Sequence, residues 1–149
     1  MQHRIAKSGP LLDSLGKRIT FLQGCCDALG LADVQCVHAR AEEFAGQHRE
    51  QYDVAVSRAV AQLNVLCELT LPLVKVGGQF LAMKSVDSDA ELDSARGAIG
   101  QLGGKIEAIR DYTIPGTEVT HRVVVIRKAK DTPPQFPRSW ARMKKAPLK

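Results

Sequence analysis

The segment YDVAVSRAVAQLNVLCELTLPLVKVGGQFLAMKS, residues 52–85, contains the pattern that decides the fold. Residues 52–58 read as a strand with apolar side chains on both faces, as buried parallel strands have. A helical pattern follows over residues 63–78, interrupted near Pro72 and ended by two glycines. Residues 79–84 predict a second buried strand. This order predicts a parallel β-α-β unit.

The same alternation occurs upstream of this segment. Residues 14–30 predict a helix that Ser14 can cap and Gly30 can end. The sequence VQCVHA, residues 34–39, predicts a short strand, and one or two helical turns follow from Arg40. The N-terminal part therefore continues the alternation of helices and strands.

Downstream, the pattern ends differently. Ser88 and Glu91 have capping-box spacing before a helix that ends at residues 103–104. Residues 105–114 and 121–128 then predict two strands joined by a loop. The whole order predicts an α/β fold with a mostly parallel sheet, helices on both faces and an antiparallel edge strand.

An acid near the N-terminus raises a question about function. In GPLLDSLGKRITFLQ, residues 9–23, an apolar run ends at Asp13, directly before a helical pattern. In nucleotide-binding α/β folds, an acid at the carboxyl end of a strand often binds ribose hydroxyls, about 20 residues after a glycine-rich loop. Only twelve residues precede Asp13, and they contain no such loop. We therefore expect the loop to belong upstream of this chain.

Composition limits the class of protein. The 149 residues are 44% hydrophobic, which is ordinary for one globular domain, and no apolar run approaches membrane-spanning length. The first ten residues are too few and too polar for a signal peptide, so we expect a cytoplasmic protein. The four cysteines form no CxxC pair, and no histidine stands at ligand spacing from them, which predicts free thiols and no metal.

The net charge of +5 is concentrated at the C-terminal end. Residues 127–149 contain eight basic residues and one acid, whereas the other 126 residues carry a net charge of −2. A basic end on a near-neutral body is typical of a protein with a polyanionic partner such as RNA, and a merely solvated tail is the alternative. Three prolines in residues 128–138 preclude a regular helix and make that stretch linker-like.

Four stretches of the sequence carry a family resemblance. They are LLDSLGKRITFL, HARAEEFA, the segment of residues 52–85 and HRVVVIRKAKDTPPQFPR, in this order over residues 11–138. They resemble the RsmG/GidB-type family of bacterial 16S ribosomal RNA guanine-N7 methyltransferases. The resemblance implies a class I, Rossmann-like methyltransferase fold with S-adenosyl-L-methionine as cofactor. It also implies 16S ribosomal RNA or the small ribosomal subunit as partner, no membrane, no metal and a monomeric protein.

Two departures from the family pattern have consequences. The family has a first strand and a glycine-rich loop just before Leu11, and both are missing here. Because that strand lies at the centre of the sheet, its absence predicts two half-sheets with unpaired edges. The tail also has Trp140 where the family has small residues. We expect a non-family stretch at residues 1–10, a partial methyltransferase domain at 11–128 and a basic tail at 129–149.

The resemblance indicates candidate cofactor-binding residues, and each has an ordinary alternative. Asp13 corresponds to the acid that contacts the ribose, or it caps a helix. Ala41 and Glu42 correspond to a pair beside the adenine, although Glu42 could be a solvated acid in the first turn of a helix. Arg58 corresponds to a cofactor-site arginine at the end of a strand where parallel sheets bind ligands; a buried ion pair is its alternative.

Five basic residues are candidates for contact with RNA phosphates, and all could equally be ordinary surface charges. They are Lys84, Arg122, Arg138, Lys144 and Lys145. Trp140 could stack on a base or anchor the tail to the domain. The four histidines show no spacing typical of catalysis, and no catalytic residue is predicted.

The expected reaction is methyl transfer to N7 of a guanine in 16S ribosomal RNA. Guanine N7 has a free lone pair and no proton, so its attack needs no general base. Catalysis would then depend on alignment and on exclusion of water. The alternatives are a truncated, catalytically inactive remnant that keeps only an RNA-binding surface, and a small-molecule methyltransferase, which the basic tail disfavours. Because the glycine-rich loop is missing, we expect this chain to bind S-adenosylmethionine weakly or not at all.

Overall fold

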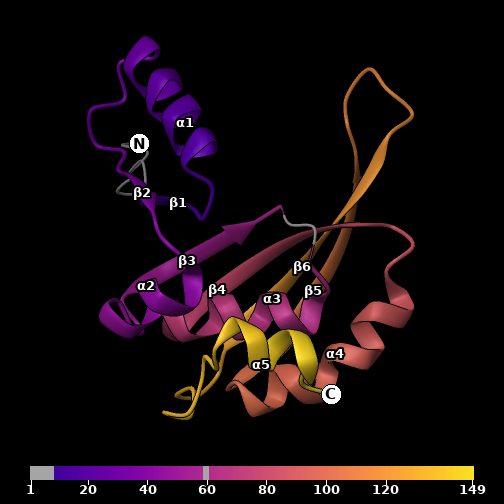
Figure 1. Ribbon diagram of the computed structural model, residues 1–149. Helices are drawn as coiled ribbons and strands as arrows, with labels where there is room; N and C mark the ends of the chain where they lie inside the picture. The colour runs from indigo at the N-terminus through magenta and orange to yellow at the C-terminus, as the bar shows by residue number, and fades with distance from the viewer. Residues whose placement is uncertain (1–8, 59–60) are drawn as a thin grey trace. The chain divides into compact units, whose positions relative to one another are not determined.

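The computed structural model describes residues 9–58 and 61–149 and divides the chain into two units (Figure 1). Unit 1 comprises Met1–Phe44 and unit 2 comprises Ala45–Lys149. This division differs from the three parts expected from the sequence, because the basic tail belongs to unit 2. Each unit has its own sheet.

Unit 1 contains a small parallel sheet and a helix. β1 (Leu11–Asp13) pairs with β2 (Cys36–His38), and α1 (Gly16–Ala28) connects the two strands. α2 (Ala41–Gln47) begins shortly after β2. Among the described residues of unit 1, only Cys26 and Phe44 have a buried apolar side chain. Unit 1 therefore has little hydrophobic core of its own.

The start of α1 differs from the prediction. Leu15 occupies the N-cap position, and no side chain caps the helix. The Asp13 carboxylate instead accepts a hydrogen bond from the Leu15 backbone N–H at 2.8 Å, which closes a turn before the helix begins. Neither Ser14 nor Asp13 is thus the N-cap. The helix ends as predicted before Gly30, whose φ of +67° suits glycine.

The predicted β-α-β unit is present in unit 2. β3 (Tyr52–Ser57) and β4 (Val74–Ser85) are parallel, and α3 (Leu63–Thr70) connects them. The prediction that the helix continues to residue 78 is wrong. Pro72 lies in a single 3-10 turn, Leu71–Leu73, after which the backbone becomes extended.

Two glycines explain how β4 can begin at Val74, five residues before the predicted start of the strand. The pairing of β4 with β3 shifts register between Tyr52 and Val54, next to the two glycines of β4. A Cβ atom on Gly78 would lie 2.5 Å from the Asp53 carbonyl oxygen, so only glycine permits this close approach. A glycine pair that looks like a helix stop in the sequence therefore accommodates an irregularity within a strand.

The second half of unit 2 confirms the predicted antiparallel pair. α4 (Asp89–Gln101) leads into β5 (Gly104–Thr113), which pairs with β6 (Thr120–Lys128). The strand order is β3-β4-β6-β5, and β6 is antiparallel to both of its neighbours. The predicted capping box of α4 is not formed. Ser88 Oγ donates to the Ser85 carbonyl at 2.7 Å, and the Glu91 carboxylate is held by Lys84.

The core of unit 2 lies between its sheet and the helices α3 and α4. Phe80, Val124 and Ile126 are fully buried on this face of the sheet. On β3, the alternate residues Val54 and Val56 are 50% and 58% exposed. The expectation that this strand is buried on both faces is therefore wrong, because the buried core of the described part of unit 2 occupies one face only.

The tail is packed onto unit 2 and does not behave as a linker. The Arg49 guanidinium donates to the carbonyl oxygens of Thr132 and Phe136, both at 2.6 Å, and to that of Pro133 at 3.0 Å. A proline-rich segment cannot form a regular ladder, so its carbonyl groups need other donors. After this segment comes α5 (Trp140–Lys145), drawn in yellow in Figure 1, whose Met143 is fully buried.

The sheets are separate, as predicted. One contains β1 and β2, and the other contains β3, β4, β6 and β5. Within residues 9–58 and 61–149, β1 and β3 each pair with one strand only. The prediction of two half-sheets with unpaired edges is confirmed for this part of the chain.

Candidate functional site

In unit 1, the carboxyl ends of β1 and β2 bring Asp13 close to the start of α2. The Ala39 backbone N–H donates to the Asp13 carbonyl at 3.2 Å, and α2 begins two residues later at Ala41. The structure thus brings together three candidate cofactor residues, Asp13, Ala41 and Glu42, at one edge of a small parallel sheet. Ligands of α/β proteins commonly bind at this edge.

The Asp13 side chain is oriented by its neighbours. Oδ1 accepts from Leu15 N–H, and Arg18 Nη1 lies 3.4 Å from Oδ2. The hydrogen bond from Leu15, followed by the interaction with Arg18, lowers the pKa of Asp13 although desolvation opposes them. An ionised carboxylate has acceptor capacity left for a hydroxyl group.

Glu42 is less exposed than a freely solvated acid would be. Its side chain is 14% exposed, and Arg40 Nε lies 3.7 Å from its Oε1. At this distance the pair is a weak ion pair rather than a hydrogen bond. The preceding residue, Ala41, has only a methyl group as its side chain. The two residues offer a small side chain and an acceptor at the beginning of α2.

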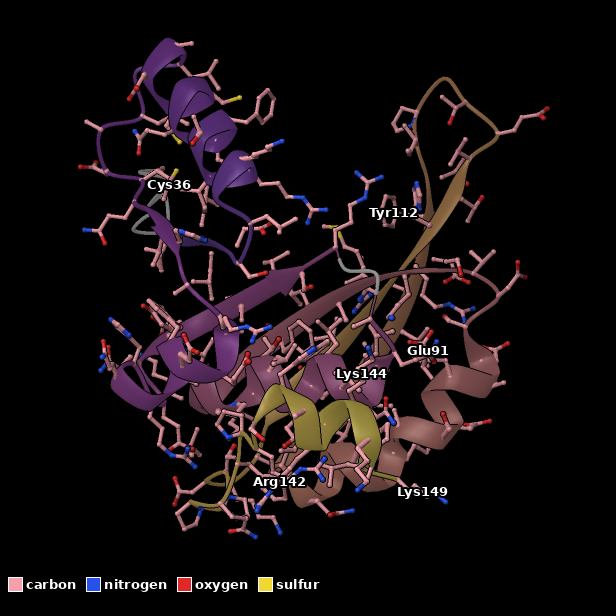
Figure 2. The ribbon with its side chains drawn as sticks, in the orientation of Figure 1. Cys36, Glu91, Tyr112, Arg142, Lys144 and Lys149 are labelled. Carbon is pink, nitrogen blue, oxygen red and sulfur yellow. The ribbon has the colours of Figure 1, made fainter. Side chains whose placement is uncertain are left out.

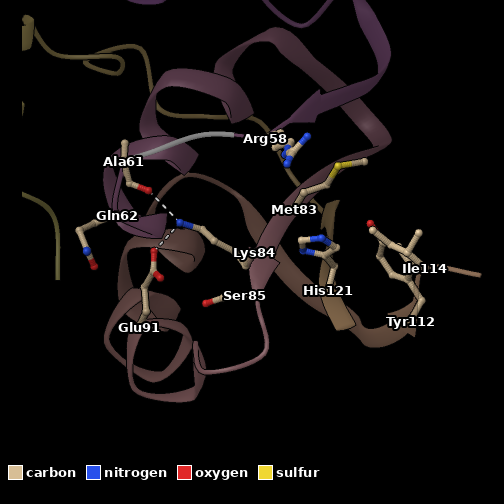
Figure 3. A pocket seen from close by; sticks show the side chains of 10 residues that line it. All are labelled: Arg58, Ala61, Gln62, Met83, Lys84, Ser85, Glu91, Tyr112, Ile114 and His121. Atoms are coloured by element: carbon tan, nitrogen blue, oxygen red, sulfur yellow. Dashed lines mark hydrogen bonds and ion pairs between the residues drawn. The ribbon is translucent and has the colours of Figure 1, made fainter. Parts of the chain in front are cut away.

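In unit 2, a cavity of about 470 Å³ lies at the carboxyl ends of β3 and β4 (Figure 3). Arg58, directly after β3, reaches it from one side, and the β5–β6 hairpin forms another wall. The residues around it are Arg58, Ala61, Gln62, Met83, Lys84, Ser85, Glu91, Tyr112, Ile114 and His121. Arg58 is exposed and takes part in no ion pair among the described residues, so the buried-pair alternative for it is not observed.

Lys84 also lines this cavity, but its ammonium group is already engaged. Nζ donates to the Ala61 carbonyl at 2.8 Å and to Glu91 Oε1 at 2.6 Å, and the side chain is only 8% exposed (Figure 3). Glu91 Oε1 also accepts from the Leu63 backbone N–H. This pair connects β4, α4 and the start of α3, which gives Lys84 a structural role beside the cavity.

Arg122 lies outside the cavity. Its guanidinium forms two hydrogen bonds with Asp111, at 2.7 and 3.0 Å, and one with Asp89 at 2.6 Å. The hydrogen bond from Arg122 lowers the pKa of Asp111, and the two carboxylates raise the pKa of Arg122. The adjacent residue His121 lines the cavity instead.

Arg138 is likewise committed within the fold. It donates to Glu68 through its backbone N–H and Nε, both at 2.8 Å, and through Nη2 at 2.7 Å. Glu68 is 1% exposed, so this ion pair is largely buried. Lys144 and Lys145, by contrast, are exposed on α5, and the described residues provide no ion-pair partner for either (Figure 2 labels Lys144).

Sequence reasoning missed Tyr112, His121 and Glu91 as parts of the site. Tyr112 and His121 are directly opposite each other on β5 and β6. Two strands of known register place such residues together, but the register depends on an irregularity between Ile106 and Ala108 that the sequence does not reveal. The alternation of polar and apolar residues in β5 is the one signal that could have indicated the pair.

Three further observations concern metal ligands, membrane helices and cysteines. Within the described ranges, no group of three or more His, Cys, Asp or Glu side chains is arranged to hold a metal ion. Over the same ranges, no helix combines the length and the apolar composition needed to cross a membrane. All four cysteines are free thiols, as predicted, and Cys26 and Cys67 are buried.

Comparisons with known proteins agree closely with the fold and the motifs. The family model GidB, described as rRNA small subunit methyltransferase G, matches residues 4–118. A Staphylococcus carnosus protein named ribosomal RNA small subunit methyltransferase G is 47% identical over 93% of this chain. A protein of the same name from Clostridium botulinum (strain Loch Maree / Type A3) is 50% identical over the same share. The chain spans 59% of the length of each.

Solved structures identify the fold. An rRNA methylase from Streptococcus thermophilus superimposes with a TM-score of 0.59 at 17% identity, covering 83% of this chain and 75% of that protein. M. jannaschii TYW2, solved in complex with AdoMet, gives a TM-score of 0.61 at 13% identity, covering 80% of this chain and 56% of that protein. At such identities the similarity establishes the class I methyltransferase fold and nothing finer.

Proposed function

Because this chain belongs to the rRNA small subunit methyltransferase G family, we propose that it provides the larger part of an S-adenosylmethionine-dependent methyltransferase of 16S ribosomal RNA. The main support for this proposal is the high sequence identity to the bacterial relatives over nearly the whole chain. An inactive remnant is the weaker candidate, since the cofactor-side motifs of β1, β2 and β3 are all kept. An enzyme with this substrate would act in the cytoplasm, and we expect it to be monomeric.

The residues present fit part of the cofactor. The Asp13 carboxylate can accept a hydrogen bond from the ribose hydroxyls, and the small side chain of Ala41, next to Glu42, is suited to contact with an adenine ring. Arg58 is an exposed cation at a strand end, suited to the carboxylate of the methionine part. S-adenosylmethionine, when bound, supplies an electrophilic methyl group. The protein's own contribution is to hold the target base in line and to exclude water.

Methylation of guanine N7 requires no general base in the site. Guanine N7 carries a lone pair and loses no proton when it is methylated, so the protein needs no proton acceptor. The cavity of unit 2 has a cation, Arg58, at its mouth, and its two other charged residues, Lys84 and Glu91, neutralise each other. These features are compatible with methylation at guanine N7, which we propose as the reaction.

For contact with RNA phosphates we propose Lys144 and Lys145. Both are exposed, whereas Lys84, Arg122 and Arg138 are engaged in ion pairs. Each cation that neutralises a phosphate contributes about 0.7 to 0.9 to the magnitude of the log–log salt slope of binding, the lower value applying to single strands. Replacing both lysines by alanine should therefore reduce that magnitude by about 1.5 to 2. Titration of RNA over a range of salt concentrations checks this, and identical slopes would remove α5 from the RNA interface.

The methyltransferase proposal is tested with two proteins. One is this chain, and the other is a chimera in which the residues that precede the matched region in the Staphylococcus carnosus relative are joined to it. Each is incubated with small ribosomal subunits lacking the modification and with S-adenosylmethionine, and 7-methylguanine is measured by mass spectrometry. We expect methylation by the chimera and none or little by the chain alone. A folded chimera that binds the cofactor but never methylates would contradict the proposal.

The cofactor roles are tested in the same chimera by calorimetry. Glu42→Ala and Arg58→Ala should each weaken binding of S-adenosylmethionine, about tenfold if one charge-assisted hydrogen bond is lost. Arg96→Ala is the matched control, because Arg96 is an exposed cation on α4 far along the chain from the motifs. Unchanged affinity in the folded Glu42 and Arg58 variants would exclude these residues from the site.

A further inference from the structure

We propose that Tyr112 and His121 form a platform on which a nucleobase of the RNA substrate stacks at the cavity of unit 2. The inference rests on the proposed function and specifies where that function engages a base. Figure 2 shows Tyr112 on the β5–β6 hairpin, and Figure 3 shows both rings at one wall of the cavity.

The geometry of the two rings leaves room for a third. Tyr112 and His121 face each other across the strand pair, with ring centroids 6.0 Å apart and planes inclined by 40°. In this tilted arrangement the rings do not cover each other face to face. Tyr112 is 41% exposed, which leaves part of its ring surface accessible to solvent. Exposed aromatic rings are the common stacking surface for unpaired bases in RNA-binding proteins.

The surroundings of the platform fit a nucleotide rather than an apolar ligand. Met83 and Ile114 add apolar surface beside the rings, and Arg58 places a positive charge at the same cavity. Lys84 and Glu91 are neutralised by each other, so Arg58 is the uncompensated charge among the lining residues. Two ring faces, adjoining apolar side chains and a cation that is unpaired when no cofactor is bound match a base attached to a phosphate.

The remaining polar groups can meet the edge of a base. Gln62 and Ser85 line the cavity, and both side chains can donate and accept hydrogen bonds. The volume of about 470 Å³ is in the range of ordinary small-molecule sites and accommodates a single nucleotide. The platform therefore has the size, the apolar surface and the charge for one unstacked nucleotide.

The test uses the chain itself with guanosine 5′-monophosphate as the probe and ribose 5-phosphate as the probe without a base. Binding is followed by nitrogen–proton correlation spectra at millimolar probe concentrations. We expect guanosine 5′-monophosphate to shift the signals of Tyr112, Ile114 and His121, and ribose 5-phosphate to leave them unchanged. Tyr112→Leu should weaken binding about tenfold, as loss of one stacked ring does, while Tyr112→Phe should retain it.

Phe21→Leu provides the matched control, because Phe21 is a strongly exposed aromatic residue on α1 and no part of the cavity. Its affinity for the probe should equal that of the unchanged chain. Equal shifts from both probes would mean that only the phosphate binds, and equal affinity of the Tyr112→Leu variant would mean that no ring stacks. Either result, or no binding at all, overturns the platform.

The result can be separated from that of the methylation experiment, since no cofactor is used here. If the chimera methylates but binding of the probe does not depend on Tyr112, the platform proposal is wrong and the methyltransferase proposal stands. Tyr112-dependent binding without methylation would leave a nucleotide site and contradict the enzyme.

Discussion

At the scale of single residues, the buried carboxylate of Glu68 determines what Arg138 does. A charge that is 1% exposed needs a partner, and Arg138 supplies three hydrogen bonds to it. Removing the side chain of Arg138 takes away two of these hydrogen bonds and the compensating positive charge, and leaves the buried carboxylate with the backbone N–H of residue 138. We predict that Arg138→Ala lowers the free energy of unfolding by about 3 kcal/mol, measured by urea denaturation.

The control for this prediction is Arg142→Ala. Arg142 is an exposed arginine on α5, labelled in Figure 2, and its guanidinium forms no ion pair among the described residues. Its replacement should change the free energy of unfolding by no more than about 0.5 kcal/mol. Equal stability of the two variants would show that the Glu68 pair contributes nothing.

A second prediction at this scale concerns acid. The hydrogen bond from Arg122 lowers the pKa of Asp111 in the folded protein below its ordinary value of 3.8. A lowered carboxyl pKa stabilises the fold at pH values above the ordinary one, and this contribution is lost as the pH falls through the folded-state pKa. We predict that Asp111→Asn lowers the melting temperature at neutral pH and that this difference shrinks in acid. Glu118→Gln, at an exposed carboxyl group on the hairpin loop, should show no such trend.

The sequence indicated candidate residues for the site, but it did not indicate which ion pairs the basic residues form. Asp13, Ala41 and Glu42 could be grouped from the sequence through the family resemblance, and the structure places Asp13 at the end of β1 and the other two at the start of α2, shortly after β2. Arg122 and Arg138 could not be assigned, because their carboxylate partners lie far from them in sequence and meet them only in the folded chain. From the sequence alone, Arg138 looks like an RNA contact because it lies near the basic C-terminal end. The structure shows that it pairs with the buried carboxylate of Glu68 instead.

At the scale of elements, two glycines around the end of α4 have opposite requirements. Gly103 has a φ of +86°, and a Cβ atom there would collide with the Lys130 carbonyl oxygen. Gly100 lies in the helix, is exposed and has free space around it. We predict that Gly103→Ala destabilises the protein by at least about 2 kcal/mol, whereas Gly100→Ala stabilises it by about 0.5 kcal/mol.

Thermal unfolding of both variants checks the pair of predictions. The Gly103 carbonyl also accepts hydrogen bonds from the Ala129 and Lys130 backbone N–H groups, so its displacement would disturb the start of the tail as well as α4. A stable Gly103→Ala variant would mean that the positive φ is dispensable.

Elements with a regular pattern were predictable, and those with irregular backbone were not. The helix expected between Ser88 and residues 103–104 is α4, and the strand expected at residues 121–128 is β6, so both elements were predicted correctly. The early start of β4 depends on a register shift, and the packing of the proline-rich tail depends on Arg49, some 83 residues or more away in sequence. Local patterns contain no information about such distant donors.

At the scale of the whole molecule, the two units should differ in stability. Unit 2 has a contiguous buried core, while Cys26 and Phe44 are the buried apolar residues of the described part of unit 1. Regions with few buried apolar contacts open more readily than the core. We predict that amide hydrogens of β1 and β2 exchange faster, by orders of magnitude, than those of β4 and β6.

Hydrogen exchange followed by mass spectrometry of peptides checks this prediction. Slow exchange of residues 11–38, equal to that of β4, would mean that unit 1 is as stable as the core of unit 2. Faster exchange there would mean that the less stable part of the fold contains β1 and β2, next to the proposed cofactor residues Asp13, Ala41 and Glu42.

The outer edge of β3 has a consequence for the solubility of the protein. Among residues 9–58 and 61–149, no strand pairs with this edge of β3, and such an edge is a template onto which a second chain can be added. The exposed Val54 and Val56 make that addition more favourable. One charge acts against it: Arg58 directly follows the strand and forms no ion pair among the described residues, whereas Asp53 is paired with Lys75, so the Arg58 side chains of two chains repel when edges meet in the same direction. Added salt screens this repulsion. Aggregation, followed by light scattering, should therefore increase with both protein concentration and ionic strength, so that dilute, low-salt buffers keep the protein dispersed.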